Sequence, residues 1–373
     1  MDQKEIRKRA RALGIEIGRL TPGEYNAITD VPGIRVGHST IKKGESEKGK
    51  VSGVARTGVT VIVPHETIWH QPIFAGSHVI NGNGEMTGTS WLGESGLLTT
   101  PIAITNTNSV GIARDALVAY YFEQFPDDAP KWLLPVVAET WDGILSDPKG
   151  MFLQKEDVIN ALESAKSGYV EEGSVGGGTG MICHEFKGGI GTSSRKLSLK
   201  GQNFHVGSLV QANYGLRYQL QIDGVPVGKE LPVETISGIG QFYNSESAIA
   251  KERGSIIIVT ATDIPLLPSQ CERLARRTSA GLARMGSIYG NDSGDIAIAF
   301  STGNMIMSND AFHNITCLGN DVISDVFEAV VESTEEAILN ALCSAETLSG
   351  IDGRTVHAMP VDEVKKILKT YNR

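Results

Sequence analysis

The chain has 373 residues, 40% of them apolar and 21% charged, so it is long enough to bury a sizeable core in one large domain or two average ones. Its 43 acidic residues outnumber its 34 lysines and arginines, and the net charge of −9 argues against binding to a phosphate backbone. We expect a cytoplasmic protein without membrane contact, because no apolar stretch approaches the roughly 18 residues of a membrane span and no secretory signal is visible at the N-terminus.

Glycine and cysteine usage narrow the class further. With 43 glycines and 6% aromatic residues, the chain favours tight turns and close backbone contacts, as in a catalytic α/β protein. The cysteines lie far apart without C-x-x-C spacing, which predicts buried free thiols in a reducing compartment. They are Cys183, Cys271, Cys317 and Cys343.

In the first two thirds of the chain, buried strands alternate with helices and turns. A short basic helix is expected over 1–14, and a strand with a Pro-Gly turn over 26–38. Runs that are apolar on both faces predict buried strands at 58–64, 100–107 and 133–140, and a further strand at 204–215. Helices are predicted at 110–122 and 154–168. The loop at 81–88 and the segment at 173–195 are rich in glycine, and the polar segment at 238–254 is the best candidate for an exposed linker.

Beyond this linker the pattern is more regular. A buried strand at 255–262, a helix at 269–286 and a buried strand at 294–302 form a crossover unit, which usually makes its two strands parallel. Within it, Ser269 and Glu272 have capping-box spacing. Two more helices are predicted at 322–345 and 361–370, and the whole alternation indicates an α/β layered fold.

Three common types of catalytic site find little support. His65 and His70 are five residues apart, whereas two zinc ligands on one helix face need a spacing of four. The sequence "GSVGGGTGMICHEFK" contains no Gly-Lys-Ser/Thr, so glycine-rich turns explain it better than a phosphate site. No G-x-S-x-G nucleophile elbow is present, which leaves a Ser-His-Asp hydrolase unsupported.

The Gly254-Ser255 pair offers a different nucleophile. If the bond between these residues were cut, Ser255 would carry both a hydroxyl and an α-amine whose pKa of roughly 7.7–8.0 suits a general base. Glycine at 254 would allow the strained backbone that attack on its carbonyl needs. For Gly-Ser alone, a simple turn before a strand remains the better explanation.

The context of the pair strengthens the catalytic interpretation. If the strands of the crossover unit are parallel, Ser255 lies at the same sheet end as Ser293 and Asp295 of "NDSGD". A hydroxyl and a carboxylate there could orient Ser255. On spacing alone, a polar loop between a helix and a strand is the better explanation of "NDSGD".

Longer motifs carry a specific resemblance. The stretch "ERGSIIIVTATDIPLLPSQCERLARR", followed by "GDIAIAFST", resembles the DmpA-type aminopeptidases, also called L-aminopeptidase/D-esterases, and their β-peptidyl aminopeptidase relatives. The likeness extends over nearly the whole chain through "NAITDVPGIRVGH", "NGNGEMTG", "VVAETWDG", "VGGGTGMICHEFKGGIGTSSR" and "LVQANYG".

The resemblance implies a fold, an activity and an assembly. The fold would be a four-layer α-β-β-α sandwich, shared with ornithine acetyltransferases and similar to N-terminal-nucleophile hydrolases. One catalytic domain would cleave itself between Gly254 and Ser255 into chains 1–254 and 255–373. The mature enzyme would need no metal or organic cofactor and would form a homo-oligomer, commonly a tetramer of cleaved pairs. Its substrates would be short peptides, amino-acid amides or esters with a free amine, including D- or β-amino acids at the first position.

The resemblance also assigns residues. Ser255 would be the nucleophile, Asn213 the oxyanion donor, and Glu139 the partner of the substrate ammonium, while Ser293 and Asp295 would assist self-cleavage and orient the serine. Two tryptophans would wall the pocket: Trp132 and Trp141.

Two positions depart from the pattern of the family. Trp141 stands where some relatives have tyrosine, so no hydroxyl is available there, and Asp295 stands where some have glutamate.

Two other functions compete with the aminopeptidase interpretation. An acyltransferase of the ornithine acetyltransferase type would use threonine where this chain has Ser255. A non-catalytic, unprocessed binding homologue would not need Ser255, Asn213, Glu139 and Ser293 together.

Overall fold

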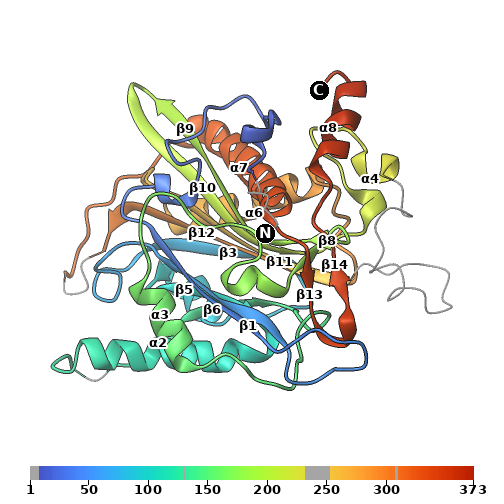
Figure 1. Ribbon diagram of the computed structural model, residues 1–373. Helices are drawn as coiled ribbons and strands as arrows, with labels where there is room; N and C mark the ends of the chain where they lie inside the picture. Colours follow the sequence, from blue (N-terminus) through green and yellow to red (C-terminus); the bar gives the residue numbers. More distant parts are fainter. Residues whose placement is uncertain (1–7, 130, 232–252, 307–309) are drawn as a thin grey trace.

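A computed structural model describes residues 8–129, 131–231, 253–306 and 310–373. Two β-sheets pack face to face, and helices cover the outer face of each, which gives four layers (Figure 1). The predicted α-β-β-α sandwich is therefore confirmed. Apolar side chains from both sheets form one core between them, and a second core lies between the larger sheet and its helices.

The smaller sheet has four strands in the order β1-β2-β5-β6. β5 and β6 are parallel, and the other pairs are antiparallel. Every residue of β2, β5 and β6 is buried, as expected for the centre of a layered fold. Helices α2 (Val110–Gln124) and α3 (Lys155–Glu163) pack on this sheet. Its strands are β1 (Arg35–Lys43), β2 (Ala55–Val63), β5 (Ile102–Asn106) and β6 (Val136–Thr140).

The larger sheet has six strands in the order β4-β3-β12-β11-β10-β9. β11 and β12 are parallel and joined through helix α6 (Pro268–Arg284), as the crossover pattern predicts. Helix α7 (Ile323–Ser344) packs beside α6 on the same face. The strands are β3 (Ile73–Gly82), β4 (Leu97–Leu98), β9 (Gly189–Leu199), β10 (Gln202–Asn213), β11 (Arg253–Thr262) and β12 (Asp292–Met305).

Smaller elements complete the molecule around these layers. The α-helices among them are α1 (Thr89–Ser95), α4 (Val227–Glu230) and α8 (Val361–Thr370). Two short hairpins are built from β7 (Ile182–Cys183) with β8 (Phe186–Lys187), and from β13 (Leu348–Ser349) with β14 (Thr355–Val356). Single 3₁₀ turns occur at Arg11–Leu13, Ile28–Asp30, Thr107–Ser109, Gly176–Gly180, Arg217–Gln219, Asn320–Val322 and Ile351–Gly353.

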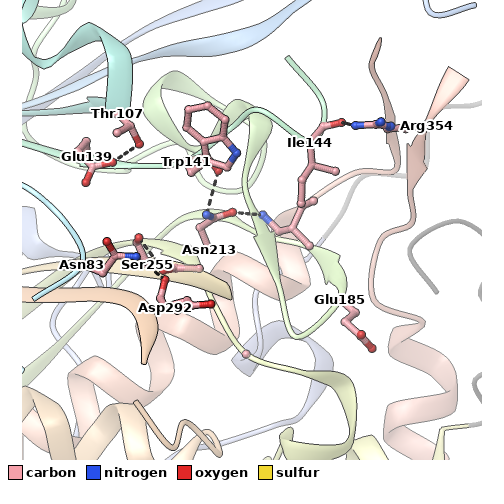
Figure 2. Close-up of a pocket in the computed structure, with 13 residues that line it drawn as sticks. Asn83, Thr107, Glu139, Trp141, Ile144, Glu185, Asn213, Ser255, Asp292 and Arg354 are labelled. Carbon is pink, nitrogen blue, oxygen red and sulfur yellow. Dashed lines mark hydrogen bonds between the residues drawn. The ribbon is translucent and has the colours of Figure 1, made fainter. Parts of the chain in front are cut away.

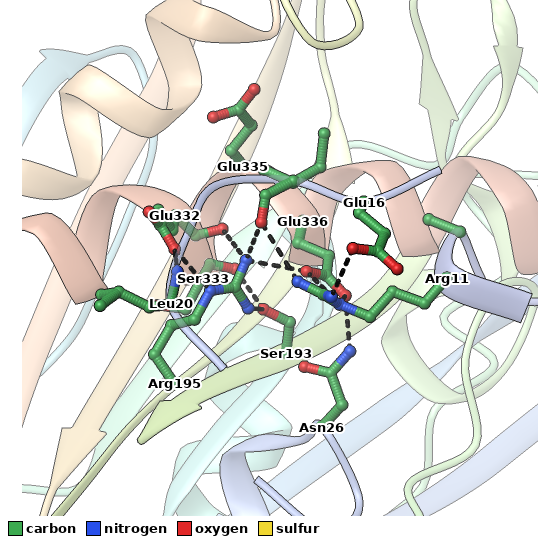
Figure 3. A network of polar contacts seen from close by, with 12 residues as sticks. Arg11, Glu16, Leu20, Asn26, Ser193, Arg195, Glu332, Ser333, Glu335 and Glu336 are labelled. Atoms are coloured by element: carbon green, nitrogen blue, oxygen red, sulfur yellow. Dashed lines mark hydrogen bonds and ion pairs between the residues drawn. The ribbon is translucent and has the colours of Figure 1, made fainter. Parts of the chain in front are cut away.

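A buried ion network joins the larger sheet, α7 and the N-terminal segment (Figure 3). Arg195 of β9 is fully buried, and its guanidinium lies 2.8 Å from carboxylate oxygens of both Glu332 and Glu336. Arg11 contacts the other oxygen of Glu336 at 2.9 Å. Because each buried charge has an opposite partner, the network ties these three parts without an uncompensated charge.

Several local predictions need correction. Helix α6 begins at Pro268, so Ser269 lies inside its first turn, and it is the Gln270 side chain that accepts a hydrogen bond from the backbone of Leu267 at 2.9 Å. Cys317 is exposed, whereas the other three free thiols are buried as predicted. The predicted helix at 154–168 stops at Glu163.

Two predictions fall wholly or partly on undescribed residues. Of the basic helix expected over 1–14, the described part contains a 3₁₀ turn at Arg11–Leu13. The linker expected over 238–254 lies outside the described residues, apart from the first residues of β11. Among the helices that the structure describes, none combines the length and hydrophobicity needed to cross a bilayer.

Candidate active site

Ser255 lies near the start of β11, in the middle of the larger sheet. It is opposite Asn213, the last residue of antiparallel β10, and opposite Gly294 of parallel β12. The side chain is 5% exposed, and its Oγ donates a hydrogen bond to the carbonyl oxygen of Gly254 at 2.7 Å. In the continuous chain the hydroxyl therefore lies beside the carbonyl group of the residue that precedes it.

Gly254 is required by a close contact. A Cβ atom at this position would lie 2.2 Å from the carbonyl oxygen of Asn213 and 2.7 Å from the Cα of Tyr214. Gly254 does not have a positive φ in the uncut chain, and the strained geometry that attack on its carbonyl would need stays a prediction. The physical reason for glycine is the tight approach of β11 to the end of β10.

Ser293 and Asp295 lie beside Ser255 at the same sheet end, because β11 and β12 are parallel. Their backbones pair with those of Gly254 and Ile256, respectively. Both side chains are fully buried, and the Ser293 hydroxyl donates to the Asp295 carboxylate at 2.7 Å. The three residues share one end of the sheet, as the crossover pattern predicts, but Ser255 is paired with Gly294. Because side chains alternate along β12, those of Ser293 and Asp295 point to the other face, where they bond to each other.

Two backbone groups fix the side chain of Asn213 (Figure 2). Its Oδ1 accepts a hydrogen bond from the amide of Ile182 at 2.8 Å, and its Nδ2 donates to the carbonyl of Trp141 at 3.0 Å. Nδ2 carries a second N–H, which is available to a negatively charged oxygen formed next to Ser255. The amide is held in place before any reaction begins, which is what an oxyanion donor needs.

Glu139 comes from the opposite sheet, near the end of β6. Its carboxylate is 3% exposed and accepts hydrogen bonds from the Thr107 hydroxyl and from the backbone amide of Glu85 at 3.0 Å. Burial raises the pKa of Glu139 above the usual value for glutamate, and the two hydrogen bonds act in the opposite direction. A buried carboxylate of this kind favours a cationic partner when it is ionised.

A cavity of about 650 Å³ is lined by residues of both sheets, among them Ser255 and Asn213 of the larger sheet and Glu139 of the smaller one (Figure 2). This volume is within the range of small-molecule sites, roughly 300–1,000 Å³. Trp141, 41% exposed, forms part of its wall. The lining residues are Asn83, Thr107, Glu139, Trp141, Ile144, Ile182, Glu185, Asn213, Gly215, Gly254, Ser255, Asp292 and Arg354.

The structure does not place Trp132 with these residues. Its side chain is 81% exposed and lines a separate pocket of about 330 Å³ with Trp69 and Trp91. The two cavities share no lining residue, so the structure of one chain gives no support to Trp132 as a wall of the Ser255 cavity.

Sequence reasoning missed several lining residues. Asn83 lies in the loop "NGNGEMTG". The next residue, Gly84, is tightly packed, because a Cβ atom added to it would lie 3.2 Å from the Cα of Gly294. Thr107 directly follows β5. The sequence could have indicated Thr107, because it is a polar residue directly after a buried strand. No pattern in the sequence marks Arg354 as a site residue. Among the described residues, no cluster of three or more His, Cys, Asp or Glu could hold a metal.

Comparisons with known proteins agree with this arrangement. The model of peptidase family S58 matches residues 26–356. The β-peptidyl aminopeptidase BapA of Sphingosinicella microcystinivorans is 43% identical over 371 residues, covering 98% of this chain and 93% of its own.

Solved structures of aminopeptidases are also similar to this chain. A β-aminopeptidase from Burkholderia sp. superimposes with a TM-score of 0.86 at 46% identity, covering 97% of this chain and 99% of its own. A second solved structure is the L-aminopeptidase D-Ala-esterase/amidase of Ochrobactrum anthropi, described as a prototype of the serine aminopeptidases with a variant of the Ntn hydrolase fold. It superimposes with a TM-score of 0.89 at 42% identity, covering 98% of this chain and 99% of its own. The resemblance and the fold that it implied are confirmed. The chain belongs to peptidase family S58 and is a hydrolase of the aminopeptidase class.

Proposed function

We propose that the chain is a self-processing aminopeptidase of one catalytic domain, cut between Gly254 and Ser255 into chains 1–254 and 255–373. The position of the Ser255 hydroxyl carries the proposal, because it lies 2.7 Å from the carbonyl oxygen of Gly254 inside the cavity that also contains Glu139 and Asn213. Attack of Oγ on the Gly254 carbonyl carbon would move the acyl group from nitrogen to oxygen. Hydrolysis of that ester would then free the α-amine of Ser255.

Ser293 and Asp295 assist this first step. Their bonded pair lies fully buried beside the scissile bond, where it orients the Ser255 segment through the neighbouring strand. After cleavage the pair keeps the new N-terminus in position. The same residues thus serve both self-cleavage and the later reaction.

In the mature enzyme the freed α-amine is the general base. Its ordinary pKa of roughly 7.7–8.0 lets it accept the hydroxyl proton near neutral pH. Ser255 Oγ then attacks the first carbonyl of the substrate, and Asn213 Nδ2 donates to the resulting oxyanion. The leaving amine departs with a proton, and water or another amine resolves the acyl-enzyme.

Glu139 limits the reaction to substrates with a free amine. Ionised and buried, it pairs with the substrate ammonium and thereby fixes the first carbonyl next to Ser255. Short peptides, amino-acid amides and esters satisfy this requirement, and the names of the relatives support D- or β-amino acids at the first position. The first side chain lies against Trp141.

The remaining properties follow the family. We propose a cytoplasmic homo-oligomer, a tetramer of cleaved pairs, that works without metal or organic cofactor. The exposed aromatic surface around Trp91 and Trp132 supports assembly, because large exposed apolar patches commonly mark protein interfaces.

The intact mass of freshly purified protein under denaturing conditions tests self-processing. Two species that match residues 1–254 and 255–373 are expected. A single full-length species that stays whole for days while the preparation hydrolyses amino-acid amides would overturn the proposed nucleophile.

Replacing Glu139 with glutamine is expected to lower kcat/KM for amino-acid p-nitroanilides by roughly 10–100-fold, because one charge-assisted hydrogen bond is lost. In the unmodified enzyme, kcat/KM should fall first as the α-amine of Ser255 becomes protonated, and fall more steeply as the pH passes through the raised pKa of Glu139, since the protonated side chain cannot pair with an ammonium. The Glu139→Gln variant should keep the first decline and lose the second.

The control for this prediction is Glu123→Gln, which removes a surface carboxylate that is 55% exposed and pairs with Lys155. The control should keep both the rate and the pH profile. Equal pH profiles for Glu139→Gln and the unmodified enzyme would contradict the assignment of Glu139.

A further inference from the structure

The cavity has two chemically different ends. Glu139, bonded to Thr107, lies on one side of Ser255 and Asn213, and Arg354 lies on the opposite side (Figure 2). Among the described residues that line the cavity, Arg354 carries the single positive charge. Because Glu139 receives the substrate's N-terminal ammonium, the leaving part of the substrate extends toward Arg354.

A dedicated small core holds Arg354 in place. The hairpin of β13 and β14 packs through Val356 and Leu348 against Leu145 and Ile182. Its turn is fixed by two backbone hydrogen bonds: the amide of Gly350 donates to the carbonyl of Arg354 at 2.8 Å, and the amide of Arg354 donates to the carbonyl of Ile351 at 3.0 Å.

Contacts with the segment after Trp141 leave this hairpin little freedom. The amide of Ile351 donates to the carbonyl of Leu145 at 3.0 Å. A Cβ at Gly350 would lie 2.0 Å from the same carbonyl oxygen, so only glycine allows this approach. Ile182, in the same small core, donates its amide to Asn213, so Arg354 and the oxyanion donor share one support.

We propose that Arg354 binds the free carboxylate of the residue that leaves, so that the enzyme prefers dipeptides over the same substrates blocked at the C-terminus. This inference rests on the proposed function. A guanidinium matches a carboxylate with two parallel N–H donors, and a half-buried site strengthens that pair relative to bulk water. Ammonium and carboxylate then hold a short zwitterionic peptide across Ser255.

The other charges near Arg354 are compatible with this role. Glu185 also lines this end, but its carboxylate accepts a hydrogen bond from the amide of Arg217 at 3.3 Å and lies 3.9 Å from the Arg217 guanidinium. Asp292 is at the start of β12, where the Asn291 side chain donates to it at 3.0 Å. One of the contacts of Arg354 is the hydrogen bond that it donates to the carbonyl of Ile144 at 3.5 Å. A guanidinium carries five N–H donors, so it can bind a carboxylate in addition to its contacts within the protein.

The experiment compares an alanyl dipeptide that has a free carboxylate with the same dipeptide as its C-terminal amide. The first residue is L-alanine or β-alanine, whichever is released faster, and release is followed by chromatography. The unmodified enzyme should favour the free acid by about tenfold in kcat/KM, mainly through KM. This advantage should shrink at high ionic strength, because Arg354 is partly exposed to solvent.

The variant Arg354→Gln should lose the advantage by slowing hydrolysis of the acid while leaving the amide unchanged, and Arg354→Lys should retain part of it. Arg276→Gln is the matched control, because Arg276 is 51% exposed on α6 and pairs with Glu272. It should keep the preference intact.

Two results would overturn the inference while leaving the proposed function standing: equal kcat/KM for acid and amide in the unmodified enzyme, or an equal loss for both in Arg354→Gln. The second result would mean that Arg354 only supports the hairpin. If the unmodified enzyme releases alanine from neither dipeptide, the proposed function fails and the inference fails with it.

Discussion

Ser255→Ala is expected to remain a single chain of 373 residues and to have no measurable aminopeptidase activity. Without Oγ, nothing can attack the Gly254 carbonyl, so the bond stays intact and the α-amine that would serve as base is never formed. One substitution therefore removes the nucleophile and the base together. Intact mass and hydrolysis of an amino-acid p-nitroanilide measure both losses in the same preparation.

A matched serine separates this effect from general damage to the sheet. Ser198 is an exposed residue of β9, in the same sheet and far from the cavity, so Ser198→Ala should be cleaved and active. The Ser255→Ala variant should also fold and unfold cooperatively, because a single buried hydroxyl is lost. Cleavage at the same bond in Ser255→Ala would show that another group does the chemistry.

The sequence predicted the part of the site that depends on local pattern. Apolar strands on either side of an amphipathic helix are enough to predict parallel β11 and β12, and this pairing places Ser255, Ser293 and Asp295 at one sheet end. The start of α6 was predicted one residue too late, because Ser269 and Gln270 are both plausible capping residues. Only the hydrogen bond from Leu267 to Gln270 decides between them.

Other parts of the site depend on contacts that no local pattern records. Glu139 and Asn213 reach Ser255 from different sheets, so their meeting depends on how the two sheets pack. Without the family resemblance, Glu139 would have been interpreted as a carboxylate at the end of a strand. Arg354 follows Ser255 by almost a hundred residues, and its place is set by a core of a few side chains around Leu145. For Trp132 the family resemblance implied a place in the wall of the Ser255 cavity, whereas the structure places it in a separate pocket.

The two-sheet construction also explains why the site is rigid. Ser255 and Asn213 are held by the ladder of the larger sheet, and Glu139 by that of the smaller one. Gly254 and Gly84 lie where an added Cβ would meet backbone atoms or the facing strand, so the cavity walls approach as closely as main chains permit. A site built on strands in this way keeps its donors fixed in place, which favours electrostatic stabilisation of a transition state.

Asn213→Ala is expected to lower kcat by about 10²–10³-fold with little change in KM, because the Nδ2 donor acts on charge that develops only in the transition state. The rate is referred to the amount of the 255–373 chain, measured by mass, so that incomplete cleavage does not imitate a catalytic loss. Asn203→Ala serves as the control, since Asn203 is an exposed residue at the other end of the same strand.

The Asn213→Asp variant tests whether donation itself is what matters. Its carboxylate can still accept the hydrogen bond from the Ile182 amide, but it has no N–H to offer to an oxyanion or to the Trp141 carbonyl, and it adds a negative charge. Its kcat should therefore fall at least as far as that of Asn213→Ala. If Asn213→Asp instead retained most of the activity, Asn213 would be a support for the Ile182 loop, and the oxyanion would have to be stabilised by backbone amides alone.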